Sequence, residues 1–196
     1  MSVRFLHGDA PRGGSLDDAL AEVQRALCVG PEAVEAKRRI LDFVAAHPGA
    51  LHRTCLGGHL TGSALVIDAA RERTLVLMHA KLGKWLQPGG HADGEGHLAT
   101  VALDEAEEET GIKGLAVAGP AVDCDVHVIP ERPGEPEHLH LAVRYIVSAP
   151  VDAVVIGNHE SHALKWVTLG ELEEIAGDPS LARLGQAGFA LVHELG

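Results

Sequence analysis

Three glutamates in the stretch "LDEAEEETGI" stand at the spacing of neighbours on one helix face. Glu105, Glu108 and Glu109 are separated by three and one positions, so a helix places them within one turn. Like charges at this spacing repel, and no Lys or Arg lies between Lys84 and Lys113 to offset them. A divalent cation would supply the counter-charge, and carboxylate oxygens suit Mg²⁺ or Mn²⁺. The alternative is an acidic helix face that only contacts solvent.

A second polar pattern follows on two strand-like segments. Alternation puts Asp125 and His127 on one face of segment 122–129, and His140 and Arg144 on one face of segment 139–147. If the two segments pair as a hairpin, these polar faces lie together. They then form a substrate-contacting wall or an additional metal site, or else a hydrogen-bonded polar face with structural Asp to His pairs. The candidate substrate-binding residues are His91, Lys81, His127, His140 and Arg144, with a surface salt bridge as the alternative for Lys81 and Arg144.

The elements that must position these groups divide the chain into an N-terminal helical segment and a following region of strands and helices. Ser15 reads as an N-cap, and Pro31 begins a second helix that Pro48 ends, which predicts a helical hairpin. From about Gly58 onward strands intermix with a helix at 98–110, and the last 27 residues are mostly helical. We therefore expect residues 1–56 to form an N-terminal helical extension and residues 57–196 to form an α/β domain around a mixed sheet. The hairpin has three possible roles: capping the pocket, forming a homodimer interface, or supporting the sheet.

Composition narrows the classes of partner. Sixteen basic against 28 acidic residues give a formal charge of −12, which argues against nucleic acid and anionic membranes as partners. Three unclustered cysteines suggest neither a disulfide framework nor a structural zinc site. The N-terminus has no apolar signal core and no apolar run is long enough to span a bilayer, so we expect a cytoplasmic protein.

The whole stretch "GGHADGEGHLATVALDEAEEETGI" resembles the signature of the Nudix hydrolases, G-x5-E-x7-R-E-U-x-E-E-x-G-U with U aliphatic. With Gly90 as the first glycine, the matching positions are Glu105, Glu108, Glu109, Gly111 and Ile112. The resemblance covers roughly residues 57–175 and is closest to a bacterial subgroup with a "GGHADG" loop and an N-terminal helical extension. It implies an α/β/α sandwich around a central mixed sheet.

The resemblance also implies an activity and a set of site residues. Members of this family typically cleave a pyrophosphate bond in a nucleoside diphosphate linked to another group. Glu105, Glu108, Glu109 and the Gly90 carbonyl are then the metal ligands, and Mg²⁺ or Mn²⁺ is the cofactor. Glu105, Glu109 and Glu160, in the loop before the last strand, are the candidate catalytic residues.

Two positions depart from the signature. Its first Glu falls on Gly96, directly after Glu95, and its Arg falls on Asp104. In the family these two residues typically brace the loop against the helix, so the sequence predicts that this brace is missing. A catalytically weakened domain that binds a nucleotide or metabolite is therefore the alternative function. An isomerase of the same superfamily is disfavoured, because Cys55 and Cys124 are not in the arrangement that such relatives need.

Overall fold

The computed structural model describes residues 4–80, 82–157 and 161–194. In the described part of the chain the elements are β1 (Arg4–Leu6), α1 (Leu16–Arg25), α2 (Pro31–Ala46), β2 (Gly58–Ile67), β3 (Thr74–His79), β4 (Trp85–Leu86), β5 (Gly89–His91), α3 (Leu98–Thr110), β6 (Ala116–Ile129), β7 (His138–Ser148), β8 (Ser161–Val167), α4 (Leu169–Ile175) and α5 (Pro179–Glu194). No helix in this part is long and apolar enough to cross a membrane.

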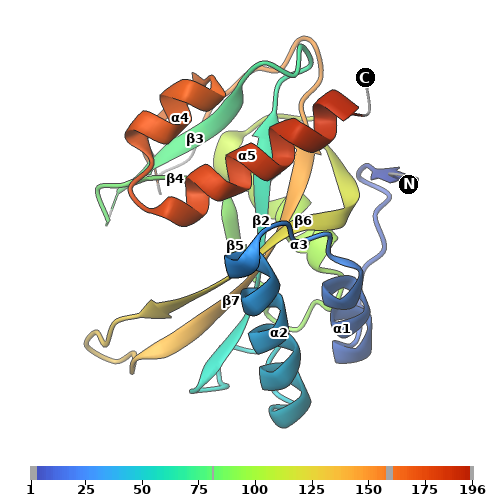
Figure 1. The fold of residues 1–196 in the computed structure, drawn as a ribbon, viewed down its shortest axis with the longest axis vertical. Helices are drawn as coiled ribbons and strands as arrows, with labels where there is room; N and C mark the ends of the chain where they lie inside the picture. The colour runs from blue at the N-terminus through green and yellow to red at the C-terminus, as the bar shows by residue number, and fades with distance from the viewer. Residues whose placement is uncertain (1–3, 81, 158–160, 195–196) are drawn as a thin grey trace.

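The strands form one mixed sheet with the order β1-β6-β7-β2-β3-β4 (Figure 1). β5 pairs with β2, β8 pairs with β3, and the pairing of β2 with β7 is parallel whereas the other pairings are antiparallel. One core lies between the sheet and α1, α2 and α3, and two smaller cores lie under α4 and α5. This arrangement confirms the predicted α/β class, with a mixed sheet between helices.

The predicted N-terminal helices are present and pack on the sheet. Ser15 and Asp18 form a capping box at the start of α1, and Pro31 is the first residue of α2. Figure 1 shows the two helices side by side, and their apolar residues share one hydrophobic core with the sheet. They therefore support the sheet, which is one of the three roles expected; a dimer contact through them stays a prediction.

Helix α3 has the predicted bounds and approaches β2 closely. The small side chains on one side of this helix are buried, and Ala102 and Ala106 are 0% exposed. A Cβ on Gly62 of β2 would lie 2.7 Å from the carbonyl oxygen of Leu98, which is closer than real contacts allow. Gly111, at φ +70°, ends the helix in the left-handed conformation that glycine adopts without strain. The short side chains on both surfaces let α3 lie directly on the sheet.

Two strands were not predicted, β1 and β5. β5 is the "GGH" segment, which the sequence placed in a loop because glycines show no apolar alternation. Its strand geometry comes from pairing with β2, where Gly90 faces Gly62 and His91 faces Thr61 in the register. Such long-range pairing cannot be read from a three-residue pattern.

The first turn of α3 is capped by a residue of α1. The N-cap residue His97 makes no side-chain capping bond. The backbone N–H of Ala99 instead donates to Oε2 of Glu22 at 3.0 Å, and the buried hydroxyl of Tyr145 donates to the same oxygen. Burial and the neighbouring Glu22 carboxylate raise the pKa of Tyr145 well above its ordinary value. Glu22 therefore joins α1, α3 and β7 at one point.

Glu22→Ala should lower the free energy of unfolding by about 2 to 3 kcal/mol, because it leaves the Tyr145 hydroxyl and the Ala99 N–H without their acceptor. Tyr145→Phe should destabilise the wild type but have little effect in the Glu22→Ala background. Urea unfolding of the four proteins in this double-mutant cycle measures the coupling. Additive effects of the two substitutions would contradict the contact.

Candidate active site

The acidic face of α3 lies against the backbone of β5. Glu109 is buried, and its Oε2 accepts a hydrogen bond from the N–H of Gly89 at 2.9 Å. The carboxylate of Glu105 lies over Gly90, where an added Cβ would collide with it. Glu108 is exposed on the same helical turn. Two of the three candidate ligands, Glu105 and Glu109, thus lie beside β5, whose Gly90 carbonyl is the fourth candidate.

The two glycines of β5 are needed for this contact. A Cβ on Gly89 would lie 2.5 Å from Oγ of Ser63, and any side chain on Gly90 would occupy the place of the Glu105 carboxylate. The glycine pair therefore creates a cradle in which carboxylate oxygens reach main-chain atoms. Such a set of hard oxygen donors fits Mg²⁺ or Mn²⁺.

Two arginines near this acidic surface, Arg12 and Arg53, come from the first 53 residues. The guanidinium of Arg53 binds Asp93 in the glycine loop, with its closest contact at 2.6 Å. Hydrogen bonding to Asp93 raises the pKa of Arg53, and the nearby charge of Glu105 adds to this effect. A distant segment of the chain therefore brings a positive charge close enough to Glu105 for the two charges to interact.

A second distant contact lies at Asp104, one of the two departures from the signature. Arg12 donates to both carboxylate oxygens of Asp104, at 2.6 and 2.8 Å. The two side chains are 57% and 45% exposed. The sequence predicted no brace here, but the structure shows an ion pair with the signs exchanged: the acid is on the helix and the Arg is on the N-terminal segment.

The other departure, Gly96, is explained by the same segment. Glu95 accepts hydrogen bonds from the backbone N–H groups of Gly13, Gly14 and His97, at 2.6, 2.8 and 2.8 Å. A Cβ on Gly96 would collide with the carbonyl oxygen of Ser15. Residues 12–15, which we call the N-terminal strap, therefore take the space that a glutamate side chain at position 96 would need.

The predicted histidine face exists and is larger than predicted. His127 is paired with His140 in the register of β6 and β7, and its Nδ1 lies 3.1 Å from Oδ2 of Asp125. His91 reaches the same face of the sheet, where its Nε2 is 3.2 Å from Nε2 of His140. The rings of His59 and His138 also lie in this cluster. Alternation along the strand places His138 on the same face as His140, whereas the sequence reasoning missed His59.

The central imidazoles of this cluster are held neutral. Burial, together with the neighbouring imidazoles, lowers the pKa of His140 to about 2 and that of His59 to about 4. Burial also lowers the pKa of His91. A neutral imidazole has one nitrogen lone pair available, so these rings are able to accept a hydrogen bond or to bind a cation near neutral pH.

Arg144 does not face an open surface. It is 2% exposed, and its guanidinium contacts Asp123, Asp125 and Ser180. Arg183 of α5 binds the same two aspartates. Burial alone would raise the pKa of Asp125, but its bond with His127 and these guanidinium groups hold that pKa well below its usual range. A structural ion-pair network fits this arrangement better than a phosphate contact.

Two candidate residues, Lys81 and Glu160, lie outside the described residues. The structure therefore brings together Gly90, Glu105 and Glu109, with Glu108 on the same turn. It separately brings together His91, His127 and His140.

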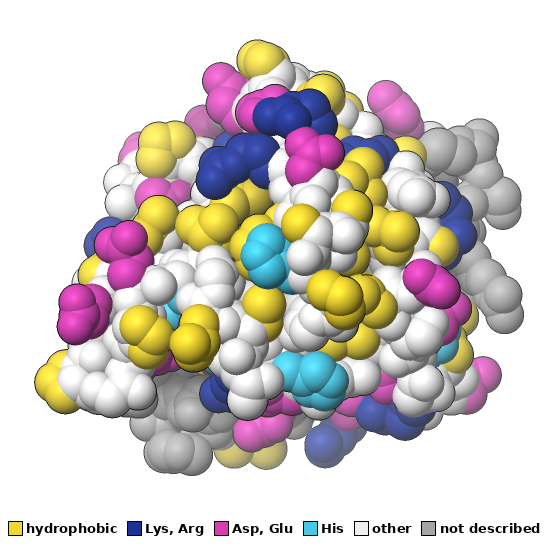
Figure 2. Space-filling model, turned by 90° about the horizontal axis from the view of Figure 1, so that it is seen from below, with side chains coloured by type: hydrophobic (Ala, Val, Ile, Leu, Met, Phe, Trp, Pro, Cys, Tyr) yellow, Lys and Arg dark blue, Asp and Glu magenta, His cyan; other side chains and the backbone are white. Residues whose placement is uncertain are grey.

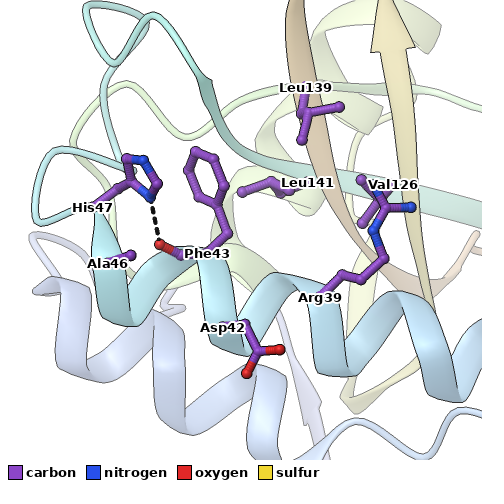
Figure 3. A pocket seen from close by; sticks show the side chains of 8 residues that line it. All are labelled: Arg39, Asp42, Phe43, Ala46, His47, Val126, Leu139 and Leu141. Atoms are coloured by element: carbon purple, nitrogen blue, oxygen red, sulfur yellow. Dashed lines mark hydrogen bonds between the residues drawn. The ribbon is translucent and has the colours of Figure 1, made fainter.

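A pocket of about 300 Å³ lies between α2 and the hairpin of β6 and β7 (Figure 3). Its lining residues are Arg39, Asp42, Phe43, Ala46, His47, Val126, Leu139 and Leu141. Leu139 and Leu141 alternate with His138 and His140 along β7, so this pocket and the histidine cluster lie on opposite faces of the strand. Figure 2, which views the molecule from below, shows hydrophobic side chains between acidic and basic ones and no continuous basic strip. The pocket is apart from the candidate metal ligands, none of which lines it.

Comparison with known proteins identifies the fold. A family model described as the NUDIX domain matches residues 59–187. Among solved structures, an Ap4A hydrolase from C. elegans in a binary complex matches with a TM-score of 0.53 and 18% identity over 69% of this chain and 98% of that one. The dihydroneopterin triphosphate pyrophosphohydrolase of E. coli matches with a TM-score of 0.52 and 15% identity, over 67% and 95% of the two chains. A search of curated proteins returned no match.

Glu95→Gln should destabilise the protein in a pH-dependent way. Burial alone would raise the pKa of Glu95, but the three N–H donors outweigh it and lower that pKa below its ordinary value of 4.5. The stabilisation is therefore fully present above about pH 4.5 and is lost as pH falls through the folded-state pKa. Urea unfolding should show a loss of about 1 to 2 kcal/mol in the variant at pH 7. The difference from wild type should shrink below pH 4, whereas Glu131→Gln, at an exposed position, should show no effect at either pH.

Gly96→Glu, which restores the signature residue, should destabilise the protein instead of improving it. Its Cβ would displace the backbone of Ser15, and overpacking of this kind costs about 1 to 3 kcal/mol. Gly170→Ala, where an added Cβ meets nothing within 4 Å, is the matched control and should be neutral or stabilising. A Gly96→Glu protein as stable as wild type in thermal unfolding would show that the strap does not lie at this position.

Proposed function

The chain belongs to the Nudix domain family, and from this premise we propose that it is a metal-dependent hydrolase that cleaves a pyrophosphate bond in a nucleoside diphosphate linked to another group. The observation that carries the proposal is the contact of α3 with β5. Glu109 accepts from the Gly89 N–H, and the Glu105 carboxylate lies over Gly90. These contacts fit the ligand set that the signature implies.

Glu105, Glu108, Glu109 and the carbonyl of Gly90 would hold Mg²⁺ or Mn²⁺. When bound, such ions supply Lewis-acid charge that offsets the phosphate oxygens and lowers the pKa of an attacking water. The N–H of Gly89 fixes the orientation of the Glu109 carboxylate. Burial of that carboxylate limits its rotation, so one geometry is favoured before the substrate arrives.

A carboxylate of the chain must accept the proton that the water loses. Glu105 and Glu109 are the candidates within the described site, and Glu160 stays a prediction from the sequence. Lys81 stays a predicted substrate contact from the sequence, whereas His127 lies with the histidine cluster on the face of the sheet opposite α3. The partner is a small phosphorylated molecule, and neither nucleic acid nor a membrane is expected.

The N-terminal strap favours an active enzyme over a weakened binding module. The alternative function rested on the loss of the brace at Gly96 and Asp104. Arg12 binds Asp104, and Glu95 accepts from three backbone N–H groups. Since the loop and helix are held by these contacts, the two departures give no reason to expect a disordered site.

Hydrolysis should be detected when the protein is incubated with nucleoside di- and triphosphates, dinucleoside polyphosphates and nucleotide sugars in the presence of Mg²⁺ or Mn²⁺. Ap4A and dihydroneopterin triphosphate, named in the two similar structures, belong in this panel. Release of phosphate or of a nucleoside monophosphate is measured, and a chelator should abolish it. If no substrate in this panel were hydrolysed at metal concentrations at which the protein binds the metal, the proposal would be contradicted.

Variants of α3 test the assignment of the ligands. Glu109→Gln and Glu108→Gln should each lower kcat/KM by at least about 100-fold, since even outer-shell groups of metal sites contribute 10- to 100-fold. Glu107→Gln, on the same helix but on another face, is the matched control and should stay within about twofold of wild type. Equal activity of Glu109→Gln and wild type would show that the site is elsewhere.

A further inference from the structure

Three imidazoles from three different strands converge on one face of the sheet. His59 is on β2, His91 is on β5 and His140 is on β7. Their ring centroids are 4.9 to 5.0 Å apart, and one ring nitrogen of each lies within 4.8 Å of the others. Within the described residues this is the one such group of three or more His, Cys, Asp or Glu ligand atoms. Among the described residues, the three glutamates of α3 do not form a second group by this criterion.

Within the described part of the chain, the central ring of this group has no hydrogen-bond partner. His59 is 3% exposed, and neither Nδ1 nor Nε2 has a partner among the described residues. A buried polar group without a partner is destabilising, and native proteins rarely keep one without a reason such as an ion or a water. A metal ion that accepts the lone pair of His59 would remove part of this destabilisation.

We propose that His59, His91 and His140 form a binding site for a divalent transition-metal ion of the zinc class. Zn²⁺ binds imidazole nitrogen at about 2.0 to 2.1 Å, so two tetrahedral ligands lie roughly 3.3 Å apart. The observed distance between Nε2 of His91 and Nε2 of His140 is 3.2 Å. Three protein ligands leave a fourth position for water or an anionic group.

This site is distinct from the glutamate site. Alternation along β5 directs Gly90 toward α3 and His91 toward the opposite face of the sheet. The first site offers oxygen donors and the second offers nitrogen donors, which zinc-class ions bind well and Mg²⁺ binds poorly. The proposal therefore does not depend on the proposed hydrolase activity.

The groups around the three ligands fit a bound cation. His138 stacks on His59 at 4.9 Å, and its Nδ1 lies 2.9 Å from the carbonyl oxygen of Pro136, which orients the ring. His127 lies edge-on to His140 at 5.3 Å and is held by Asp125. Outer groups of this kind fix the rings of metal-binding histidines.

Zinc binding to the untagged, chelator-treated full chain tests the proposal. Isothermal titration with Zn²⁺ in about 5 mM Mg²⁺ should show one ion per chain with a Kd of about 1 μM or tighter. His91→Ala and His140→Ala should each weaken this affinity at least about tenfold. His193→Ala, at an exposed position of α5 outside this cluster, is the matched control and should change it less than about threefold.

X-ray absorption of the zinc-loaded wild type gives a measurement that does not depend on any variant folding. It should show imidazole ligands at about 2.0 to 2.1 Å. A spectrum without imidazole scattering would overturn the proposal, as would a Zn²⁺ affinity unchanged by both His91→Ala and His140→Ala. A Zn²⁺ affinity that falls in Glu109→Gln but not in the histidine variants would place the ion at the glutamate site and would also overturn it.

Discussion

The close contact between the acidic end of α3 and the backbone of β5 is the constraint on which the rest of the site depends. Three carboxylates on one helical turn repel one another and oppose this contact. Burial of Glu109 adds a desolvation cost that the N–H of Gly89 offsets in part. Gly62 and the alanines of α3 reduce the distance between helix and sheet. The fold therefore places these carboxylates beside the main chain of β5, and the cation proposed above would offset their mutual repulsion.

The N-terminal segment contacts this junction of α3 and the glycine loop from outside. Arg12 contacts the helix, Glu95 in the glycine loop contacts the strap, and Glu22 of α1 caps the first turn of α3. The Arg12 pair is exposed, and such pairs contribute about 0 to 1 kcal/mol. The restraint thus comes mainly from Glu95 and Glu22, which satisfy backbone N–H groups. The two departures from the signature are therefore structurally linked to the N-terminal segment, since Arg12 contacts Asp104 and the strap fills the space beside Gly96.

The sequence predicted the features that follow from local periodicity, namely helix bounds and strand faces. It missed the features that follow from contacts between distant segments. Helix α3 has the predicted bounds because its apolar residues recur at helical spacing and Gly111 ends it. Alternation also placed His127 and His140 on facing strands. His59 was missed because β2 pairs with β7 across some eighty residues of chain, in a parallel register that no local pattern reports. Alternation put Arg144 on the correct face but could not show that Arg183 and Ser180 of the last helix cover it.

β5 links the two proposed metal sites through a single peptide unit. The Gly90 carbonyl belongs to the oxygen set and the His91 imidazole to the nitrogen set, so one rigid-body shift of β5 changes the geometry of both. The two proposed sets differ in ligand chemistry, since imidazole nitrogen suits zinc-class ions and carboxylate oxygen suits Mg²⁺ or Mn²⁺. If zinc at His91 changes the affinity of the glutamates for Mg²⁺, then Mg²⁺ must change the zinc affinity by the same factor. The short pairing of β5 with β2, three residues long, makes it the element through which such coupling would act.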